Sequence, residues 1–381
     1  MRPGAPAVGR YGAGSLDAVP LDAVPLASAG LREFTVPAPP PARHHPAVRA
    51  GRRDDAVHGW LVGVSDGRSW GWWGPVERSV AERAPGLLSA AFPELPARVA
   101  PETFARRLRR STRHAHTGAL ALTVGSLELA LWDLAGKRAG LPVWALLAPR
   151  AARDTVPVYA TCFGAATAPG QVAWVMDEVA TGYAVQKWRP AVVREELIDV
   201  SADFLARAGN GRLAVDFFGT WEPERVRTSC RPLAGALAWV EEPYHPDEVE
   251  TARPGEFGVA HAAGEHCYGP GEAVRLRAGH VDVWQPDAVF CGGLVSLVSL
   301  IRSAAQAGAQ CTPHGGGLLP ALHLAAIGEQ IAAVELHLLL EPRRQAHLAE
   351  DLLGGPDAAG SLPVPAAPGW CGDLRTDLGG D

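Results

Sequence analysis

The sequence predicts an α/β protein whose larger part is a barrel of alternating strands and helices. From about residue 155 onward, short apolar and β-branched runs recur, and the segments between them are long enough for helices. A polar residue stands at or near the C-terminal end of nearly every run after the first. Such alternating units predict a (β/α)8-type barrel, in which these ends converge on one mouth. The runs are "VPVYAT" (156–161), "AVQKW" (184–188), "LAVDF" (213–217), "LAWVEEP" (237–243), "GVAHAAGE" (258–265), "VDVWQPD" (281–287), "AQCTPHG" (309–315) and "AAVELH" (332–337).

The first 46 residues differ from the rest in amino-acid composition. They are rich in Gly, Pro and Ala and contain the direct repeat "LDAVP LDAVP" (16–25), so they predict a flexible N-terminal extension. A second interpretation is that this extension covers part of an active site. For His44 and His45, which lie in it, simple exposure to solvent is the plainer expectation.

The next hundred or so residues predict a small α+β region. Residues 57–75 alternate in polarity and contain the turn "SDG", which predicts a hairpin. Two helical stretches follow, at 101–115 and 125–148. The tryptophans at 70, 72 and 73 are expected to pack within this region rather than to contact a substrate.

Composition excludes several classes of function. The chain has 381 residues, of which 47% are hydrophobic and 20% charged, as in an ordinary globular protein. A formal net charge of -6 argues against nucleic acid as a partner. No apolar run approaches the length of a membrane span, and the first residues lack the apolar core of a secretory signal. Six cysteines without a CxxC pair indicate reduced thiols, so we expect a cytoplasmic protein.

Three carboxylates follow successive strands of the expected barrel. Asp216, Glu241 and Glu265 are separated by about one strand–helix unit each. Any single acid in such a place is usually a solvated loop residue or a helix cap, but several strands ending this way in register favour a site. The three would repel one another unless a cation lay between them, and oxygen ligands favour a hard ion such as Mg²⁺.

A second group of polar residues follows the remaining strands. Asp287 and His314 stand at successive strand ends, and a carboxylate that orients an imidazole makes a plausible general base. Glu335 lies on the last strand, near its end. Lys187 and Arg189, two residues apart on one strand, point to the same face.

Together these pieces resemble the enolase superfamily, in its mandelate racemase/muconate lactonizing enzyme-like branch. The resembling motifs run in the family's order from about residue 50 to 345 and so cover most of the chain. They are "SLELALWDLAGKRAGLPVWALLA", "GYAVQKWRP", "AVDFFGTW", "WVEEPYHPD", "AAGEHCYGP", "QPDAVFCGG", "TPHGGG" and "VELHLLLEPRRQ".

The resemblance implies a domain plan. Residues 47–150 would form an α+β capping domain that residues 341–381 complete, and residues 151–340 would form a modified TIM barrel of the (β/α)7β type. It also implies a homo-oligomer, a small-molecule carboxylate as substrate, and no membrane.

The resemblance further implies the roles of the site residues. Mg²⁺ would be bound by Asp216, Glu241 and Glu265, with Glu241 chosen over its neighbour because relatives that read "EQP" keep the first acid. His314, paired with Asp287, would remove the proton α to a substrate carboxylate, and the metal would stabilise the resulting enediolate. Glu335 would be the acid that hydrogen-bonds this intermediate.

The sequence departs from the family pattern at two places. The metal-binding strand usually reads Asp-x-Asn, but here it reads Asp216-Phe217-Phe218. The lysine strand usually reads Lys-x-Lys, but its second lysine is Arg189, and a guanidinium stays protonated and cannot readily act as a base. Racemisation needs a base on each face of the α-carbon, whereas dehydration needs only His314.

The sequence therefore favours an acid-sugar dehydratase, a hydro-lyase that converts an aldonate or aldarate to a 2-keto-3-deoxy acid. Lys187 and Arg189 would hold the substrate carboxylate or offset developing charge. His266 would touch substrate or, alternatively, support the metal ligand beside it. Two other interpretations stay open: a racemase or epimerase of a 2-hydroxy or amino acid with an unrecognised base, such as a tyrosine, and a non-catalytic relative that acts in binding or assembly.

Overall fold

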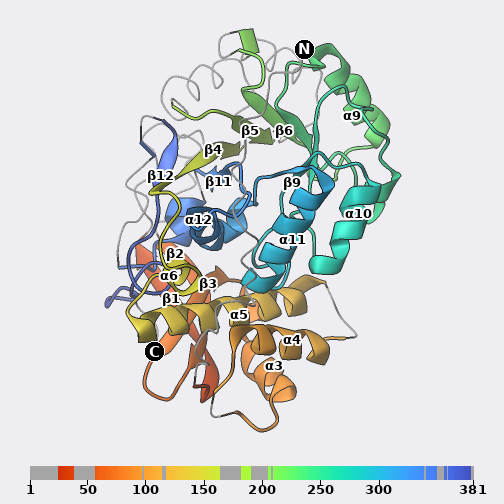
Figure 1. The fold of residues 1–381 in the computed structure, drawn as a ribbon. Helices are drawn as coiled ribbons and strands as arrows, with labels where there is room; N and C mark the ends of the chain where they lie inside the picture. The colour runs from red at the N-terminus through yellow and green to blue at the C-terminus, as the bar shows by residue number, and fades with distance from the viewer. Residues whose placement is uncertain are drawn as a thin grey trace.

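The chain folds into an N-terminal cap packed on a barrel of parallel strands (Figure 1). The computed structural model describes residues 25–37, 56–96, 98–113, 117–163, 182–189, 205–206, 209–338, 340–349, 356–357 and 359–378. The predicted α/β class and barrel are confirmed, and the eight strands expected after residue 155 are all present.

The cap combines an antiparallel sheet with helices. Its sheet has the order β1-β2-β3, and the predicted hairpin at 57–75 corresponds to β2 and β3. The helix expected over 125–148 ends earlier, because Gly140 adopts φ 66° and a second helix starts after Pro142. The elements are β1 (Ser28–Pro37), β2 (Ala56–Ser65), β3 (Trp70–Val76), α2 (Arg78–Ala81), α3 (Ala84–Ala91), α4 (Pro101–Ser111), α5 (Gly118–Ala139) and α6 (Val143–Leu147).

The prediction that residues 1–46 form one flexible extension is wrong for part of that range. Residues 28–37 form β1, which pairs with β2 along its whole length. Phe34 and Val36, alternate residues of this strand, are fully buried, and burial of that face holds the strand in the sheet. The repeat at 16–25, His44 and His45 lie outside the described residues.

The barrel strands follow one another around the sheet in the order β10-β9-β8-β7-β6-β5-β4-β11. Backbone hydrogen bonds from Ala332 to Cys311 (2.9 Å) and from Glu335 to Pro313 (3.3 Å) connect its two ends. The strands are β4 (Thr155–Phe163), β5 (Gln186–Arg189), β6 (Leu213–Asp216), β7 (Trp239–Glu241), β8 (His261–Ala263), β9 (Val283–Trp284), β10 (Gln310–Cys311) and β11 (Val334–His337).

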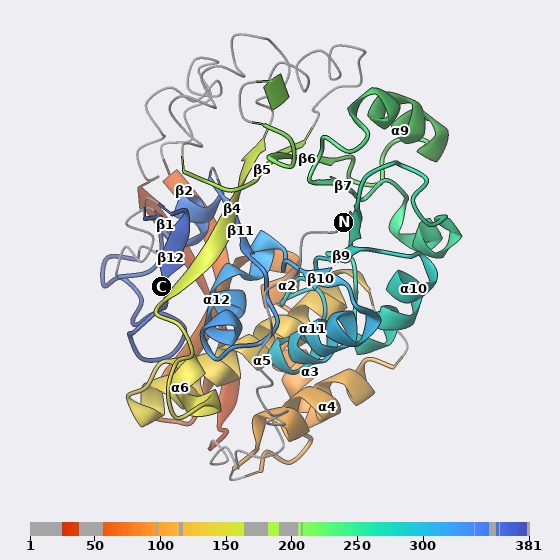
Figure 2. The ribbon, with the colours of Figure 1, turned by 45° about the horizontal axis from the view of Figure 1, so that its top comes forward.

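Helices cover the outside of this sheet, and the C-terminal segment returns to the cap (Figure 2). The strand β12 (Ser361–Pro363) pairs antiparallel with β4, and Trp370 then packs on Trp73 of the cap. The helices after β6 are α9 (Pro223–Cys230), α10 (Ala273–Ala278), α11 (Leu294–Ala307), α12 (Leu318–Ala326) and α13 (Glu341–Arg344), with short 3-10 turns at Arg231–Leu233, Pro246–Thr251, Pro270–Glu272 and Gly315–Gly317.

One helix, α5, is long and apolar enough to cross a membrane by length and composition alone. However, 72% of its most apolar window is buried inside the protein. It is therefore accounted for as the central core helix of the cap.

Candidate active site

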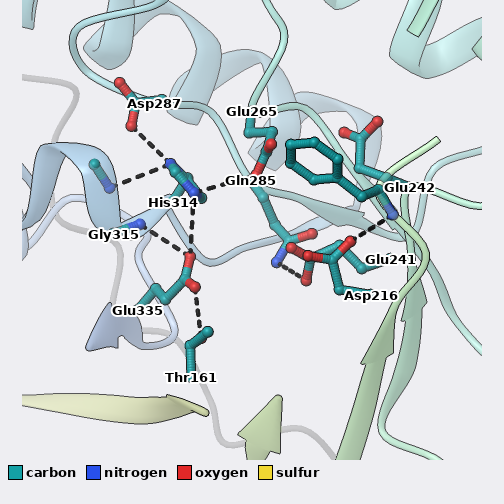
Figure 3. A network of polar contacts seen from close by, with 12 residues as sticks. Thr161, Asp216, Glu241, Glu242, Glu265, Gln285, Asp287, His314, Gly315 and Glu335 are labelled. Carbon is teal, nitrogen blue, oxygen red and sulfur yellow. Dashed lines mark hydrogen bonds and ion pairs between the residues drawn. The ribbon is translucent and has the colours of Figure 1, made fainter. Parts of the chain in front are cut away.

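The polar residues predicted at the strand ends meet at the barrel mouth (Figure 3). The register of β6 and β7 places Asp216 directly opposite Glu241. Glu265 follows the next strand, β8, by two residues. Parallel pairing brings these ends together because every strand runs in the same direction.

Lys187 is locked in ion pairs at the floor of this mouth. Its side chain is 2% exposed, and its ammonium pairs with Glu241 and, at 2.9 Å, with Glu335. Burial alone would lower the pKa of Lys187, but these two carboxylates raise it well above its usual value. Lys187 is therefore a fixed cation rather than a base.

His314 and Asp287 form the expected dyad. His314 Nδ1 lies 2.8 Å from Asp287 Oδ2, and the other oxygen of Asp287 accepts the backbone N–H groups of Val289 (2.7 Å) and Phe290 (3.0 Å). These contacts fix the carboxylate, which in turn fixes the imidazole ring.

Acidic neighbours set the charge of His314. Burial would lower its pKa, but the carboxylates of Glu265, Glu335 and Asp287 together raise it to about 10. His314 Nε2 lies 3.2 Å from Glu265 Oε2 and 3.9 Å from Glu335 Oε2. A cation bound at Glu265 would oppose the strongest of these raising effects and favour the neutral, basic imidazole.

Glu335 is held by donors on both oxygens. Thr161 Oγ1 donates to Oε1 at 2.5 Å, and the Gly315 N–H donates to Oε2 at 2.9 Å. Burial would raise the pKa of Glu335, but Lys187 and His314 lower it below its usual value. Glu335 is thus a carboxylate here, and it would have to take up a proton before it could donate a hydrogen bond to an intermediate.

The carboxylate oxygens of the three candidate metal ligands face hydrogen-bond donors of the protein itself. Asp216 Oδ1 accepts the N–H of Phe218 at 2.8 Å, Glu241 accepts from Trp239 Nε1 (2.9 Å) and Gln285 Nε2 (2.8 Å), and Glu265 faces His314. In the described part of the chain, no three His, Cys, Asp or Glu side chains already converge as a ligand cluster.

The donor set nevertheless fits a hard divalent ion. All three candidates are carboxylates on adjacent strand ends, and burial together with the charges of Asp216 and Glu335 raises the pKa of Glu241 to about 7 despite Lys187. Crowded negative charge of this kind favours a cation with oxygen ligands. Binding would require Glu241 and Glu265 to exchange their contacts with Lys187 and His314 for the ion.

His266 lies among acids rather than facing open space. Its Nδ1 is 3.6 Å from Glu242 Oε2, and its Nε2 is 3.7 Å from Glu265 Oε1. Phe218, which adopts φ 52° and is 36% exposed, packs edge-on against the His266 ring with centroids 5.9 Å apart. These contacts agree with a supporting role beside the metal ligand.

The structure does not describe the side chain of Arg189. Its backbone continues β5 and pairs with Phe163 on β4. The role expected for its guanidinium therefore stays a prediction.

Three residues of this network were missed by the sequence analysis. Gln285 Nε2 bridges Glu241 and the hydroxyl of Tyr159 (3.1 Å), and Thr161 holds Glu335. Gln285 stands two residues before Asp287, directly after β9 ends at Trp284, so its place at a strand end was the available signal. Thr161 ends the first run, and Tyr159 lies two residues before it, but neither side chain is ionisable near neutral pH, so neither stood out beside the acids and bases of the later strands.

Comparisons with known proteins agree with this architecture. The model of the enolase C-terminal domain-like family matches residues 172–378. An enolase from Bradyrhizobium, complexed with magnesium and mandelic acid, is 21% identical in sequence and has a TM-score of 0.74. The aligned region covers 93% of this chain and 96% of the Bradyrhizobium chain. L-talarate dehydratase from Polaromonas, complexed with Mg and L-glucarate, is 22% identical with a TM-score of 0.70 and coverages of 94% and 96%. A racemase from Streptomyces coelicolor with bound magnesium is 22% identical with a TM-score of 0.71 and coverages of 92% and 97%.

Proposed function

The chain belongs to the enolase superfamily, in its mandelate racemase/muconate lactonizing enzyme-like branch, and from this premise we propose that it is a Mg²⁺-dependent acid-sugar dehydratase. The observation that supports dehydration over racemisation is the contrast between two basic side chains. His314 is oriented by Asp287 at 2.8 Å, whereas Lys187 is pinned as a cation by Glu241 and Glu335. A single oriented imidazole suits a reaction that needs one base.

The proposed reaction uses His314 twice. Nε2 removes the proton from C2 of the substrate, and the electron pair left on C2 expels the C3 hydroxyl. That hydroxyl takes the same proton from the imidazolium and leaves as water. The resulting enol becomes the 2-keto-3-deoxy acid, so no oxidant or further reactant is needed.

The other residues bind and orient. Asp287 keeps the imidazole in one orientation and stabilises its protonated form. Lys187 supplies positive charge near the substrate carboxylate, and Glu335 with Thr161 borders the same space.

A bound Mg²⁺, held by Asp216, Glu241 and Glu265, would supply the charge that stabilises the enediolate. Relatives of known structure carry magnesium, and the carboxylate donors described above are those that the ion prefers.

Tyr159 is a poor candidate for the tyrosine base of the racemase alternative. Burial raises the pKa of Tyr159 well above its usual value, and its hydroxyl accepts a hydrogen bond from Gln285. A phenol with a raised pKa is a poorer base catalyst near neutral pH, because its ionised form is rarely populated.

The test is a screen of the full chain with Mg²⁺ against aldonates and aldarates, with 2-keto-3-deoxy product read as its semicarbazone. We expect at least one acid to be dehydrated, with activity lost in EDTA. The variant His314→Asn should abolish turnover while Mg²⁺ binding, measured by calorimetry, stays nearly intact. Exchange of the α-proton with solvent deuterium without ketone formation would instead establish a racemase, and absence of Mg²⁺ binding would favour the non-catalytic relative.

A further inference from the structure

The turn at residues 315–317 consists only of glycine and has no side chains of its own. It is a short 3-10 turn between β10 and α12. A Cβ at Gly316 would lie 2.1 Å from Asp287 Oδ2, and a Cβ at Gly315 would lie 3.1 Å from the Glu335 carbonyl oxygen. The turn is therefore packed tightly between the partner of the proposed base and the last strand of the barrel, and no side chain fits at Gly316.

Backbone groups of this turn contact both proposed catalytic side chains. The Gly315 N–H donates to Glu335 Oε2 at 2.9 Å (Figure 3). The Gly316 N–H is directed to His314 Nδ1 at 3.2 Å, and this is the ring nitrogen that Asp287 holds. A shift of the turn would therefore move backbone donors away from the acid and from the imidazole at the same time.

A turn made of glycine needs contacts from outside to stay ordered. Glycine loses more conformational freedom on folding than any other residue. Arg344 supplies such a contact, because its Nη1 donates to the Gly315 carbonyl at 3.0 Å. The guanidinium charge makes this bond stronger than one between neutral groups. Since the carbonyl belongs to the same peptide group as the Gly316 N–H, the bond fixes the peptide that faces His314.

Arg344 is itself held in place at the end of α13. Its backbone N–H donates to the Leu340 carbonyl at 2.8 Å. Its Nη1 lies 3.4 Å from Oε2 of Glu341, a residue that is buried and that also accepts Gln345 Nε2 at 2.9 Å. An anchored carboxylate of this kind keeps the guanidinium on the turn, although 29% of the Arg344 side chain is exposed.

We propose that Arg344 is a positioning residue for the reaction. Through the Gly315 carbonyl it holds the turn that keeps His314 and Glu335 in their orientations, and it acts through this turn rather than through contact with the substrate. The role gives the motif "EPRRQ" (341–345) a function at the site. The expected effect on turnover rests on the proposed dehydratase function, whereas the hold on the turn does not.

The kinetic test compares Arg344→Met with Arg343→Met in the full chain, on the acid sugar found by the screen. Arg343 is the matched control, because its Nη2 also donates to a backbone carbonyl, that of Ala56 in the cap, at 3.2 Å. Arg344→Met should lower kcat and kcat/KM together by roughly tenfold to a hundredfold, because a small misplacement of the base slows the chemical step. KM and the Mg²⁺ affinity from calorimetry should stay as in wild type, and Arg343→Met should match wild type throughout.

A conservative variant separates positioning from general packing. Arg344→Lys keeps a charged donor that can make the single bond to the Gly315 carbonyl, so it should recover most of kcat. A similar loss of kcat in Arg343→Met, or a change in KM in place of kcat for Arg344→Met, would show a merely structural role and overturn the inference.

Amide hydrogen–deuterium exchange tests the turn without any substrate. In Arg344→Met, the peptide that contains residues 315–317 should exchange at least about tenfold faster than in wild type, while in Arg343→Met its exchange should stay unchanged. If no acid sugar is dehydrated but Arg344→Met alone frees the turn, the hold on the turn stands and the dehydratase assignment falls. If the turn exchanges equally in Arg344→Met and wild type, or if kcat is unchanged in a working dehydratase, the inference is wrong.

Discussion

Replacing Glu128 by Gln should make the protein more stable at high pH, and the structure supplies the magnitude. Glu128 lies on α5 and is fully buried, where it accepts the Val295 N–H (2.9 Å) and Trp132 Nε1–H (3.2 Å). Arg109 is 3.8 Å from its second oxygen. Burial raises the pKa of Glu128 from 4.5 to about 7, although Arg109 opposes the shift.

The sign follows from proton linkage. Because the folded pKa lies above the unfolded value, the protonated carboxyl stabilises the fold below pH 4.5, and this contribution is lost as pH rises through 7. A shift of this size corresponds to about 3 kcal/mol at most, since one pKa unit is worth about 1.4 kcal/mol. Gln keeps the carbonyl that accepts the Val295 N–H but cannot ionise, so it does not lose this contribution.

The assay is urea unfolding of wild type and Glu128→Gln at several pH values from 4.5 to 8, in EDTA. The free energy of unfolding of the variant minus that of wild type should rise by about 3 kcal/mol across this range. The exposed control Glu94→Gln should shift stability by less than about 0.5 kcal/mol throughout. A flat difference for Glu128→Gln, or a variant that weakens relative to wild type as pH rises, would refute the reasoning.

Two further predictions concern buried cationic or neutral side chains. His323 is fully buried, with Nε2 donating to the Trp370 carbonyl (2.7 Å) and Nδ1 accepting the Trp144 N–H (3.0 Å), and burial lowers its pKa to about 4. The variant His323→Phe should lower the free energy of unfolding by about 2–5 kcal/mol at pH 7.5, measured by urea unfolding. This loss should shrink from pH 6.5 toward 4, because the unfolded wild-type protein takes up a proton on His323 in that range and the folded protein does not. A loss that grows on acidification would contradict this reasoning. The variant Lys187→Met should bind Mg²⁺ roughly tenfold more tightly in calorimetry, because the Lys187 ammonium no longer competes with the ion for Glu241. The same variant should lose turnover. Unchanged affinity would show that the ammonium and the ion do not compete.

The barrel could be predicted because buried parallel strands have a recognisable hydrophobic pattern in the sequence. Strands buried on both faces read as short apolar runs, and helices set their spacing. The last residues of those runs then had to lie at one mouth, so Asp216 and Glu241 could be placed as neighbours before any coordinates. The strand β1 was missed because its Gly, Ala and Pro residues conceal the alternation of Phe34 and Val36.

The pairings within the site could not be predicted from spacing alone. Lys187 and Glu241 are 54 positions apart, and strand order leaves open whether the ammonium turns toward this acid or toward Glu335. The choice depends on side-chain rotamers and on buried donors such as Gln285 and Trp239, which compete for the same carboxylate. Sequence placed the groups at the mouth, and packing decided their partners.

The cap motif "SLELALWDLAGK" gains a physical meaning from its contact with the dyad loop. Gly125, which comes directly before this motif, leaves no room for a Cβ, since one would lie 2.1 Å from the Val289 carbonyl oxygen, and Val289 follows Asp287 by two residues. Glu128 accepts the N–H of Val295 at the start of α11, so one helix of the cap touches both ends of the segment that leaves Asp287. The same segment donates Val289 N–H to the Asp287 carboxylate that orients His314. Because the cap supports this loop directly, small shifts of α5 should change the orientation of the base.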